Sequence, residues 1–194
     1  MTEYFFAAIP EERLYNQVLG AKSHILRSFG DQVYLKDPPH LTLYVFKATK
    51  TPAPDDFVTN KIKINLLGWQ LFGEDKVTRK STIGFAVEKT QLLEEIQIKC
   101  VKSVRNLRLG IPTRYKDVVF AGVEKENLRE YGFPYLGKNW IAHLTLCSIN
   151  SKYVEKVKEG IDITPFCGEH YLNKLCLFKL VDESPVLVWE VILE

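Results

Sequence analysis

The tetrapeptide His-Leu-Thr-Leu occurs twice in this chain, as His40-Leu41-Thr42-Leu43 and as His143-Leu144-Thr145-Leu146. The chain holds only four histidines, so two of them share three following residues by accident with odds of about one in a thousand. Both copies begin apolar stretches, His-Leu-Thr-Leu-Tyr-Val and His-Leu-Thr-Leu-Cys-Ser, and this pattern predicts β-strands. The repeat therefore predicts two similar strands within one fold.

Side chains of a strand point alternately to its two faces. His40 and Thr42 should therefore share one face, and the motif leucines should share the other. The same alternation applies to His143 and Thr145. We expect the leucines to face a core and the imidazoles and hydroxyls to face a cleft. Two such strands side by side would bring two acid–base groups and two hydrogen-bond donors together, which is typical of an enzyme.

Two His-x-Thr-x motifs on strands, separated by about half the chain, resemble those of the 2H phosphoesterase superfamily, the LigT-like or 2′-5′ RNA ligase-like proteins. The segments Tyr4–Pro10, Pro38-Pro39 and Lys138-Asn139-Trp140 are similar to that family as well. The resemblance covers most of residues 1–180. It implies an α+β fold with two pseudo-symmetric lobes of antiparallel sheet and flanking helices, in which each lobe contributes one motif strand to a central cleft.

The hydrophobic pattern by itself also favours an α+β fold. A chain of 194 residues is too short for two ordinary independent domains, so we expect one two-lobed domain over residues 1–194. A loop is predicted over 47–60 and a turn over 182–185. The predicted strands are 4–9, 62–66, 81–87, 118–123, 172–180 and 186–193, and the predicted helices follow Pro10, Thr90 and Asn150.

Composition narrows the functional classes. No apolar run approaches the ~18 residues of a membrane span. The net charge of +2 is far from that of a protein that tracks a long polyanion, so a nucleic-acid substrate should be a nucleotide or an RNA terminus. The four cysteines lack the spacing of a zinc site or a disulfide framework. We therefore expect a cytoplasmic monomer without a structural metal or cofactor.

Histidine, with an ordinary pKa of about 6.5, exchanges protons near neutral pH. Breaking a phosphodiester requires a base for the attacking water or hydroxyl and an acid for the departing oxygen, and His40 and His143 supply both. Thr42 and Thr145 can donate to the phosphate oxygens. The resemblance implies cleavage of 2′,3′-cyclic phosphates or 2′-5′-linked nucleotides, with His40 as proton donor and His143 as acceptor. The residues alone leave these two roles open.

Substrate contacts are harder to assign from sequence. Tyr44, predicted on the same face as Thr42, and Trp140 are candidates to stack on a base or ribose, although an aromatic residue in a strand more often packs in a core. Four basic residues are candidates to meet phosphate, although lone basic residues are usually solvated: Lys138, Arg114, Arg79 and Lys80.

Two alternatives to hydrolysis stay open at the level of the sequence. A nucleotide-binding or RNA-end-binding module could keep the cleft with little turnover, although binding alone needs no pair of proton-transfer groups. ATP-independent 2′-5′ RNA ligation is the reverse of 2′-5′ cleavage. His24 and His170 lack a motif context, so we expect structural or surface roles for them.

Overall fold

The computed structural model describes residues 1–54, 60–182 and 184–194. Residues 55–59 of the predicted loop and residue 183 of the predicted turn lie outside the described part. The strands are β1 (Thr2–Pro10), β2 (Leu41–Ala48), β3 (Ile62–Phe72), β4 (Ser81–Val87), β5 (His143–Ile149), β6 (Gly168–Val181) and β7 (Ser184–Ile192). The α-helices are α1 (Glu12–Phe29), α2 (Gln91–Ser103), α3 (Gly122–Tyr131) and α4 (Val154–Glu159), and short 3₁₀ helices include Thr113–Tyr115 and Gly137–Asn139.

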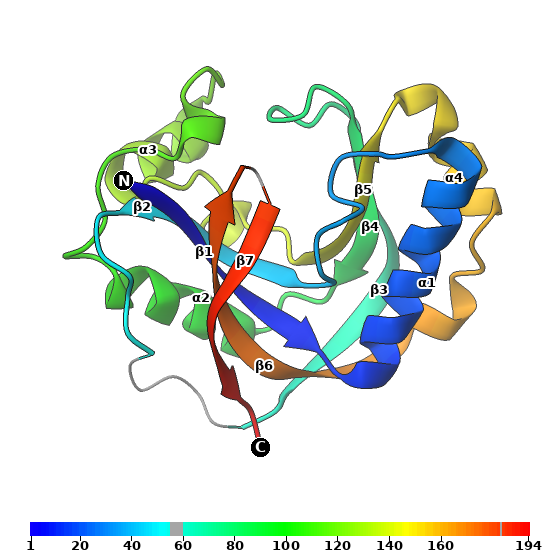
Figure 1. Cartoon of the computed structure of the whole chain (residues 1–194), viewed down its shortest axis with the longest axis horizontal. Helices are drawn as coiled ribbons and strands as arrows, with labels where there is room; N and C mark the ends of the chain where they lie inside the picture. Colours follow the sequence, from blue (N-terminus) through cyan, green and yellow to red (C-terminus); the bar gives the residue numbers. More distant parts are fainter. Residues whose placement is uncertain (55–59, 183) are drawn as a thin grey trace.

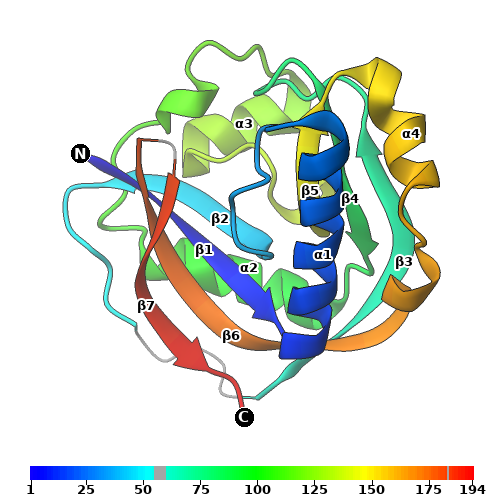
Figure 2. The same ribbon diagram turned by 45° about the vertical axis from the view of Figure 1, so that its right-hand side comes forward.

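The strands form an antiparallel sheet in the order β1-β2-β5-β4-β3-β6-β7, and β6 also pairs with β1. Strand β6 joins two lobes, because its first residues pair with β3 and its later residues pair with β1 and β7. It curves along the lower edge of the molecule from one lobe to the other (Figure 2). The lobes are thus β7-β6-β1-β2 and β6-β3-β4-β5, and the predicted two-lobed α+β fold is confirmed.

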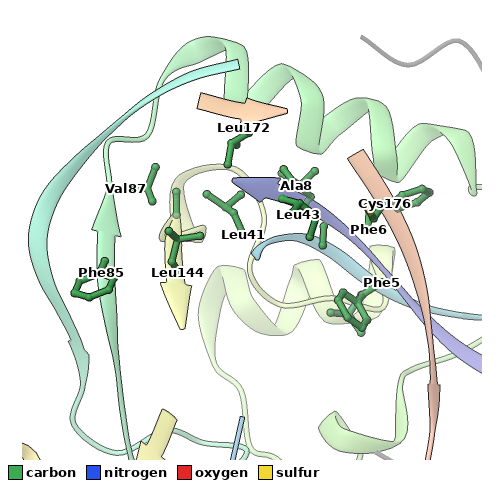
Figure 3. Close-up of a cluster of buried hydrophobic side chains, with 14 of the residues drawn as sticks. Phe5, Phe6, Ala8, Leu41, Leu43, Phe85, Val87, Leu144, Leu172 and Cys176 are labelled. Carbon is green, nitrogen blue, oxygen red and sulfur yellow. The ribbon is translucent and has the colours of Figure 1, made fainter. Parts of the chain in front are cut away.

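The motif strands meet where the two lobes join. β2 and β5 are antiparallel, with Leu41 opposite Leu144. Both leucines are fully buried and lie in one cluster of apolar side chains with Ala8, Leu43, Phe85, Val87 and Leu172 (Figure 3). Because neighbouring side chains alternate, this buried pair leaves the motif histidines and threonines on the opposite face.

Helices cover the sheet on two sides, with α1 and α4 on one side and α2 and α3 on the other (Figure 1). Helix α1 contacts β1 and β5, while α2 contacts β2, so each lobe's helix reaches the other lobe's motif strand. The helices predicted after Pro10 and Thr90 form there. Gly30 follows α1 with a φ of 73°, which suits glycine, and the Thr90 hydroxyl accepts from the Leu93 N–H at the start of α2.

The predicted strand over 118–123 is wrong. This segment contains the start of α3 and pairs with no strand; Phe120 is buried in the core, whereas Val119 is 88% exposed and Val123 is 53% exposed, so the burial does not alternate as in a strand. A short apolar run predicts a strand only if a sheet edge is free to pair with it, and the sequence does not show this. Among the described helices, none combines the length and apolarity that a membrane crossing requires.

Candidate active site

Both motif strands contain a β-bulge at the second leucine of the motif. Leu43 in β2 and Leu146 in β5 are extra residues that no partner residue opposes, and each bulge reverses the face on which the following side chains lie. The pairs that flank the two bulges are Phe6–Tyr44 and Ala7–Thr42 in one lobe and Ile83–Cys147 and Gly84–Thr145 in the other. The pseudo-symmetry of the sequence motif therefore extends to an irregularity in the backbone.

The motif histidines are held by equivalent hydrogen bonds. His40 Nδ1 lies 2.6 Å from the Pro38 carbonyl oxygen, and His143 Nδ1 lies 2.7 Å from that of Ile141. A carbonyl only accepts, so Nδ1 carries a proton in each ring, and Nε2 is the unprotonated nitrogen of the neutral form. His40 Nε2 lies 3.1 Å from Thr42 Oγ1. Each histidine thus offers the cleft a nitrogen that can accept or deliver a proton.

The four motif side chains line one cleft of about 1610 Å³. His40, Thr42, His143 and Thr145 are all half-buried. Because Leu41 opposes Leu144 in an antiparallel pair, the register sets His40 across from Thr145 and His143 across from Thr42. This arrangement places two imidazoles and two hydroxyls on adjacent strands at the same cleft. It matches the geometry that the repeated motif predicts.

Phenylalanine rings pack against both imidazoles. The Phe5 ring lies 5.2 Å from that of His40, and the Phe178 ring lies 6.4 Å from it. The Phe72 ring contacts His143 edge-on at 4.8 Å. Phe178 on β6 and Phe72 on β3 occupy equivalent places in the two lobes. These rings exclude water from one side of each imidazole and restrict its rotation.

On each of the helices α1 and α2, one polar side chain lies in the buried face. This side chain donates hydrogen bonds to the irregular backbone that precedes a motif. On α1, Lys22 is 4% exposed, and its Nζ donates to the carbonyls of Tyr34 (2.7 Å) and Asp37 (2.8 Å). On α2, the fully buried Gln97 donates to the carbonyls of Leu43 (2.9 Å) and Tyr135 (3.2 Å). The first contact fixes the segment before His40, and the second fixes the first bulge and the segment before His143.

Burial perturbs the titration of the site. The pKa of His40 is lowered to about 4: burial is the largest cause, the bond to the Pro38 carbonyl opposes it, and the positive charges of Lys22, His143 and Arg114 add to the lowering. Burial also lowers the pKa of His143, against the bond to the Ile141 carbonyl and the nearby carboxylate of Asp75. Both imidazoles are therefore less basic than free histidine.

Tyr44 does not share a face with Thr42, so this prediction is wrong. The bulge at Leu43 turns Tyr44 into the core, where it is fully buried and its hydroxyl donates to the Tyr131 carbonyl. Val45 and Lys47 line the cleft instead. An alternating pattern cannot show an extra residue in the strand, because a bulge depends on the pairing partner.

Of the other predicted substrate contacts, some line the cleft and one does not. Trp140 lines the cleft but is only 4% exposed, and its indole N–H donates to the Thr42 carbonyl at 3.2 Å, so it supports the first motif strand. Lys138 is exposed and lies outside the cleft lining, in a shallow depression with Ile141. The other predicted basic residues line the cleft: Arg79, Lys80 and Arg114.

Sequence reasoning missed Lys22 and Asp75, which both line the cleft. Lys22 carries a usable signal, since it lies four residues after Val18 within the apolar stripe of α1, where a solvated lysine is not expected. Asp75 carries none, because it lies in a polar loop between β3 and β4. Within the described residues, no group of three or more His, Cys, Asp or Glu side chains is arranged to hold a metal ion.

No family model matches this sequence, and no curated protein matches it. Solved structures do match. TT0787 of Thermus thermophilus has 14% identity over 100% of this chain and 98% of that chain, with a TM-score of 0.56. A structure described as a phosphoesterase has 12% identity over 99% of this chain and 98% of that chain, with a TM-score of 0.54. E. coli LigT in complex with 3′-AMP has 13% identity over 99% of this chain and 98% of that chain, with a TM-score of 0.52.

Likeness at such low identity concerns the fold, and here it extends over the whole chain and nearly the whole of each matched protein. In this chain, that fold is the two-lobed antiparallel sheet, with the paired motifs at the junction of its lobes. The chain therefore has the LigT-like fold of the 2H phosphoesterases, as the resemblance of its motifs predicts.

Proposed function

We propose that this protein is a phosphodiesterase that hydrolyses a 2′,3′-cyclic phosphate or a 2′-5′ phosphodiester of a nucleotide or RNA end, without a metal ion. One observation carries the proposal. Two imidazoles and two hydroxyls from adjacent antiparallel strands line the same cleft, and each Nδ1 is occupied by a carbonyl. Because each lobe contributes one half of this site, residues 1–194 act as a single catalytic unit.

The chemistry follows from this arrangement. One Nε2 accepts a proton from the attacking water while the water oxygen bonds to phosphorus. The Nε2 of the other histidine delivers a proton to the ribose oxygen while the bond between that oxygen and phosphorus breaks. Each proton transfer contributes typically 10²–10⁴-fold to the rate. The Thr42 and Thr145 hydroxyls donate to the non-bridging oxygens, where negative charge accumulates in the transition state.

Two further observations support a nucleotide phosphate as the ligand. LigT, which shares the fold, has been solved in complex with phosphate and with 3′-AMP. The cleft of this chain also carries basic side chains that could meet a phosphate anion, among them Arg79, Lys80 and Arg114. The formal net charge of only +2 suits a short substrate rather than a long polyanion.

A substrate panel tests the proposal. Wild type and His40→Ala would be assayed in excess EDTA with 2′,3′-cyclic nucleotides, 2′-5′ and 3′-5′ oligonucleotides, and ADP-ribose 1″,2″-cyclic phosphate. We expect the wild type, and not His40→Ala, to hydrolyse a 2′,3′-cyclic or 2′-5′ substrate. Binding without turnover would instead indicate a nucleotide-binding module. Turnover that stops in EDTA and returns with a divalent ion would contradict the metal-independent mechanism.

The threonines provide a finer test. Thr42→Val and Thr145→Val keep the side-chain shape and remove the hydroxyl, so we expect each to lower kcat about 10–100-fold, which is the range for a lost hydrogen bond to a charged group. Thr51→Val is a matched control, because that hydroxyl bonds to Tyr4 outside the cleft. Steady-state kinetics and urea unfolding would separate turnover from stability. Full activity of either motif variant would remove that threonine from the mechanism.

A further inference from the structure

Lys22 and Gln97 make equivalent hydrogen bonds to backbone carbonyls in the two lobes, but the two side chains differ in charge. Gln97 Nε2 has two N–H donors, and backbone carbonyls occupy both of them. Lys22 Nζ has three donors, and the carbonyls of Tyr34 and Asp37 occupy two of them. A neutral amide is therefore sufficient to hold an irregular segment in place, and Lys22 supplies a further donor and a positive charge.

The ammonium of Lys22 lies against the chain segment that ends at His40. The chain between α1 and β2 folds back beside α1 (Figure 2), and its carbonyls at Tyr34 and Asp37 accept the two bonds. The next carbonyl along this segment, that of Pro38, accepts from His40 Nδ1. Lys22, Tyr34 and Asp37 all line the cleft. The end of the lysine side chain and the first motif histidine are therefore fixed to the same wall of the cleft.

This positive charge is buried without a counter-ion. Lys22 is only 4% exposed, and no carboxylate of the described residues forms an ion pair with its Nζ. Asp37 contributes its backbone carbonyl to the bond rather than its carboxylate. Burial lowers the pKa of Lys22 to about 8, although Asp37 and Cys147 oppose this shift, so the group is still charged at neutral pH. Burial of an unpaired cation is costly, and an amide would avoid that cost, so support of the segment does not explain the charge.

An anion in the cleft would satisfy both the charge and the remaining donor. An ammonium group is tetrahedral, so the third N–H of Lys22 points away from the two carbonyls that hold the other two. Phosphate oxygens are strong acceptors for such a donor, and a charge-assisted hydrogen bond gains strength where water is excluded. Helix α1 also contacts β5, the second motif strand, so Lys22 belongs to an element that packs close to both motifs.

We propose that Lys22 binds the phosphate of the substrate: its third N–H donates to a non-bridging oxygen, while the other two hold the segment before His40. This inference rests on the proposed function, because the phosphate that Lys22 contacts is the one on which the motif residues act. Lys22 stays protonated throughout and transfers no proton. Its positive charge offsets the negative charge that accumulates on the non-bridging oxygens in the transition state.

Binding of inorganic phosphate tests this contact without any turnover. Lys22→Gln gives α1 the same neutral amide that α2 carries, so it removes the charge and retains donors for the two carbonyls. We expect calorimetry at pH 7 to show a Kd for phosphate about 10–100-fold higher than in the wild type, the range for one hydrogen bond between charged groups. Lys36→Gln is the control, because this exposed lysine of the cleft lining is paired with Asp31, and it should bind phosphate as the wild type does. A folded Lys22→Gln protein with wild-type phosphate affinity would overturn the proposal.

A second measurement uses the wild type alone, so it does not depend on the folding of a variant. The titration of the Lys22 ammonium can be followed by NMR, through bonds from its backbone resonances, with and without saturating phosphate. An anion in contact with the ammonium favours its charged form, so phosphate should raise the pKa of Lys22 by roughly one unit. Lys36 serves as the internal control and should titrate equally in both samples. A Lys22 pKa that phosphate leaves unchanged would overturn the proposal, because a lysine that only supports the segment does not respond to the ligand.

Kinetics separates this inference from the proposed function. With an active substrate from the panel, Lys22→Gln should lower kcat/KM about 10–100-fold, because the lost contact acts on the oxygens that gain charge. If phosphate binding depends on Lys22 and no phosphodiester is cleaved, the proposed function fails while the phosphate contact stands. If a phosphodiester is cleaved and Lys22→Gln keeps the kcat/KM of the wild type, the contact fails while the function stands.

Discussion

Replacing either motif histidine with alanine should lower kcat/KM by about 10²–10⁴-fold, because in the proposed mechanism each ring supplies one of the two proton transfers. The fold should survive. His40 and His143 are half-buried at the cleft, and the adjacent leucines, rather than the imidazoles, fill the core. Initial rates would measure the loss of activity, and urea denaturation would measure the free energy of unfolding. A variant that loses activity in proportion to its stability would identify that histidine as structural.

The double variant is the sharper measurement. Acid and base serve the same transition state, so the loss in His40→Ala/His143→Ala should be much smaller than the product of the two single losses. His24→Ala provides the matched control, because this histidine lies on α1 outside the residues that line the cleft. It should keep full activity. Multiplicative losses in the double variant would contradict a shared site.

Local patterns were sufficient to predict the elements that bury one regular face. The apolar residues of α1 recur with the period of a helix, and the short, largely apolar run of β4 is typical of a buried strand. Both elements form where predicted. The paired motifs also predict the arrangement of the candidate site, since Leu41 and Leu144 meet in the core and leave the polar residues on the cleft side. These features depend on spacing within one element, which a sequence displays directly.

The rest depends on partners that are distant in sequence. Tyr44 lies in the core because a bulge at Leu43 shifts the register against β1. Asp75 is fixed by a hydroxyl of β4, and Lys22 is buried by a loop that folds over its helix. The local contexts of Tyr44 and Asp75 fit a cleft or surface position equally well, and the apolar stripe of α1 indicates that Lys22 is buried without indicating what it bonds. Their roles follow from tertiary pairing and therefore could not be derived from the local pattern.

Gly84→Ala should be the most destabilising small substitution near the site. Gly84 pairs with Thr145 beside the second bulge, and a Cβ atom added there would lie 2.3 Å from the Leu144 carbonyl oxygen and 3.1 Å from the Thr145 Cα. Both contacts are to backbone, so rotation of a side chain cannot relieve them. The motif strand β5 would have to move away from β4, breaking ladder hydrogen bonds that flank His143.

We therefore expect Gly84→Ala to lower the free energy of unfolding by about 2–4 kcal/mol, at or above the usual cost of overpacking, because backbone must shift. Thermal unfolding would show a fall in Tm of roughly 5–15 °C for a chain of this size. Gly20→Ala is the matched control. Gly20 is exposed in α1 with no atom near the added Cβ, so alanine there should stabilise the protein by about 0.5–1 kcal/mol.

The same variant links stability to chemistry. The backbone that the new methyl group would displace carries Thr145 and lies next to His143, so the protein that remains folded should also lose catalytic efficiency. Activity per folded molecule, measured well below the unfolding temperature, would reveal this second loss. A Gly84→Ala protein as stable and as active as wild type would show that β4 and β5 can separate freely. In that case their close approach could not be what positions the second motif.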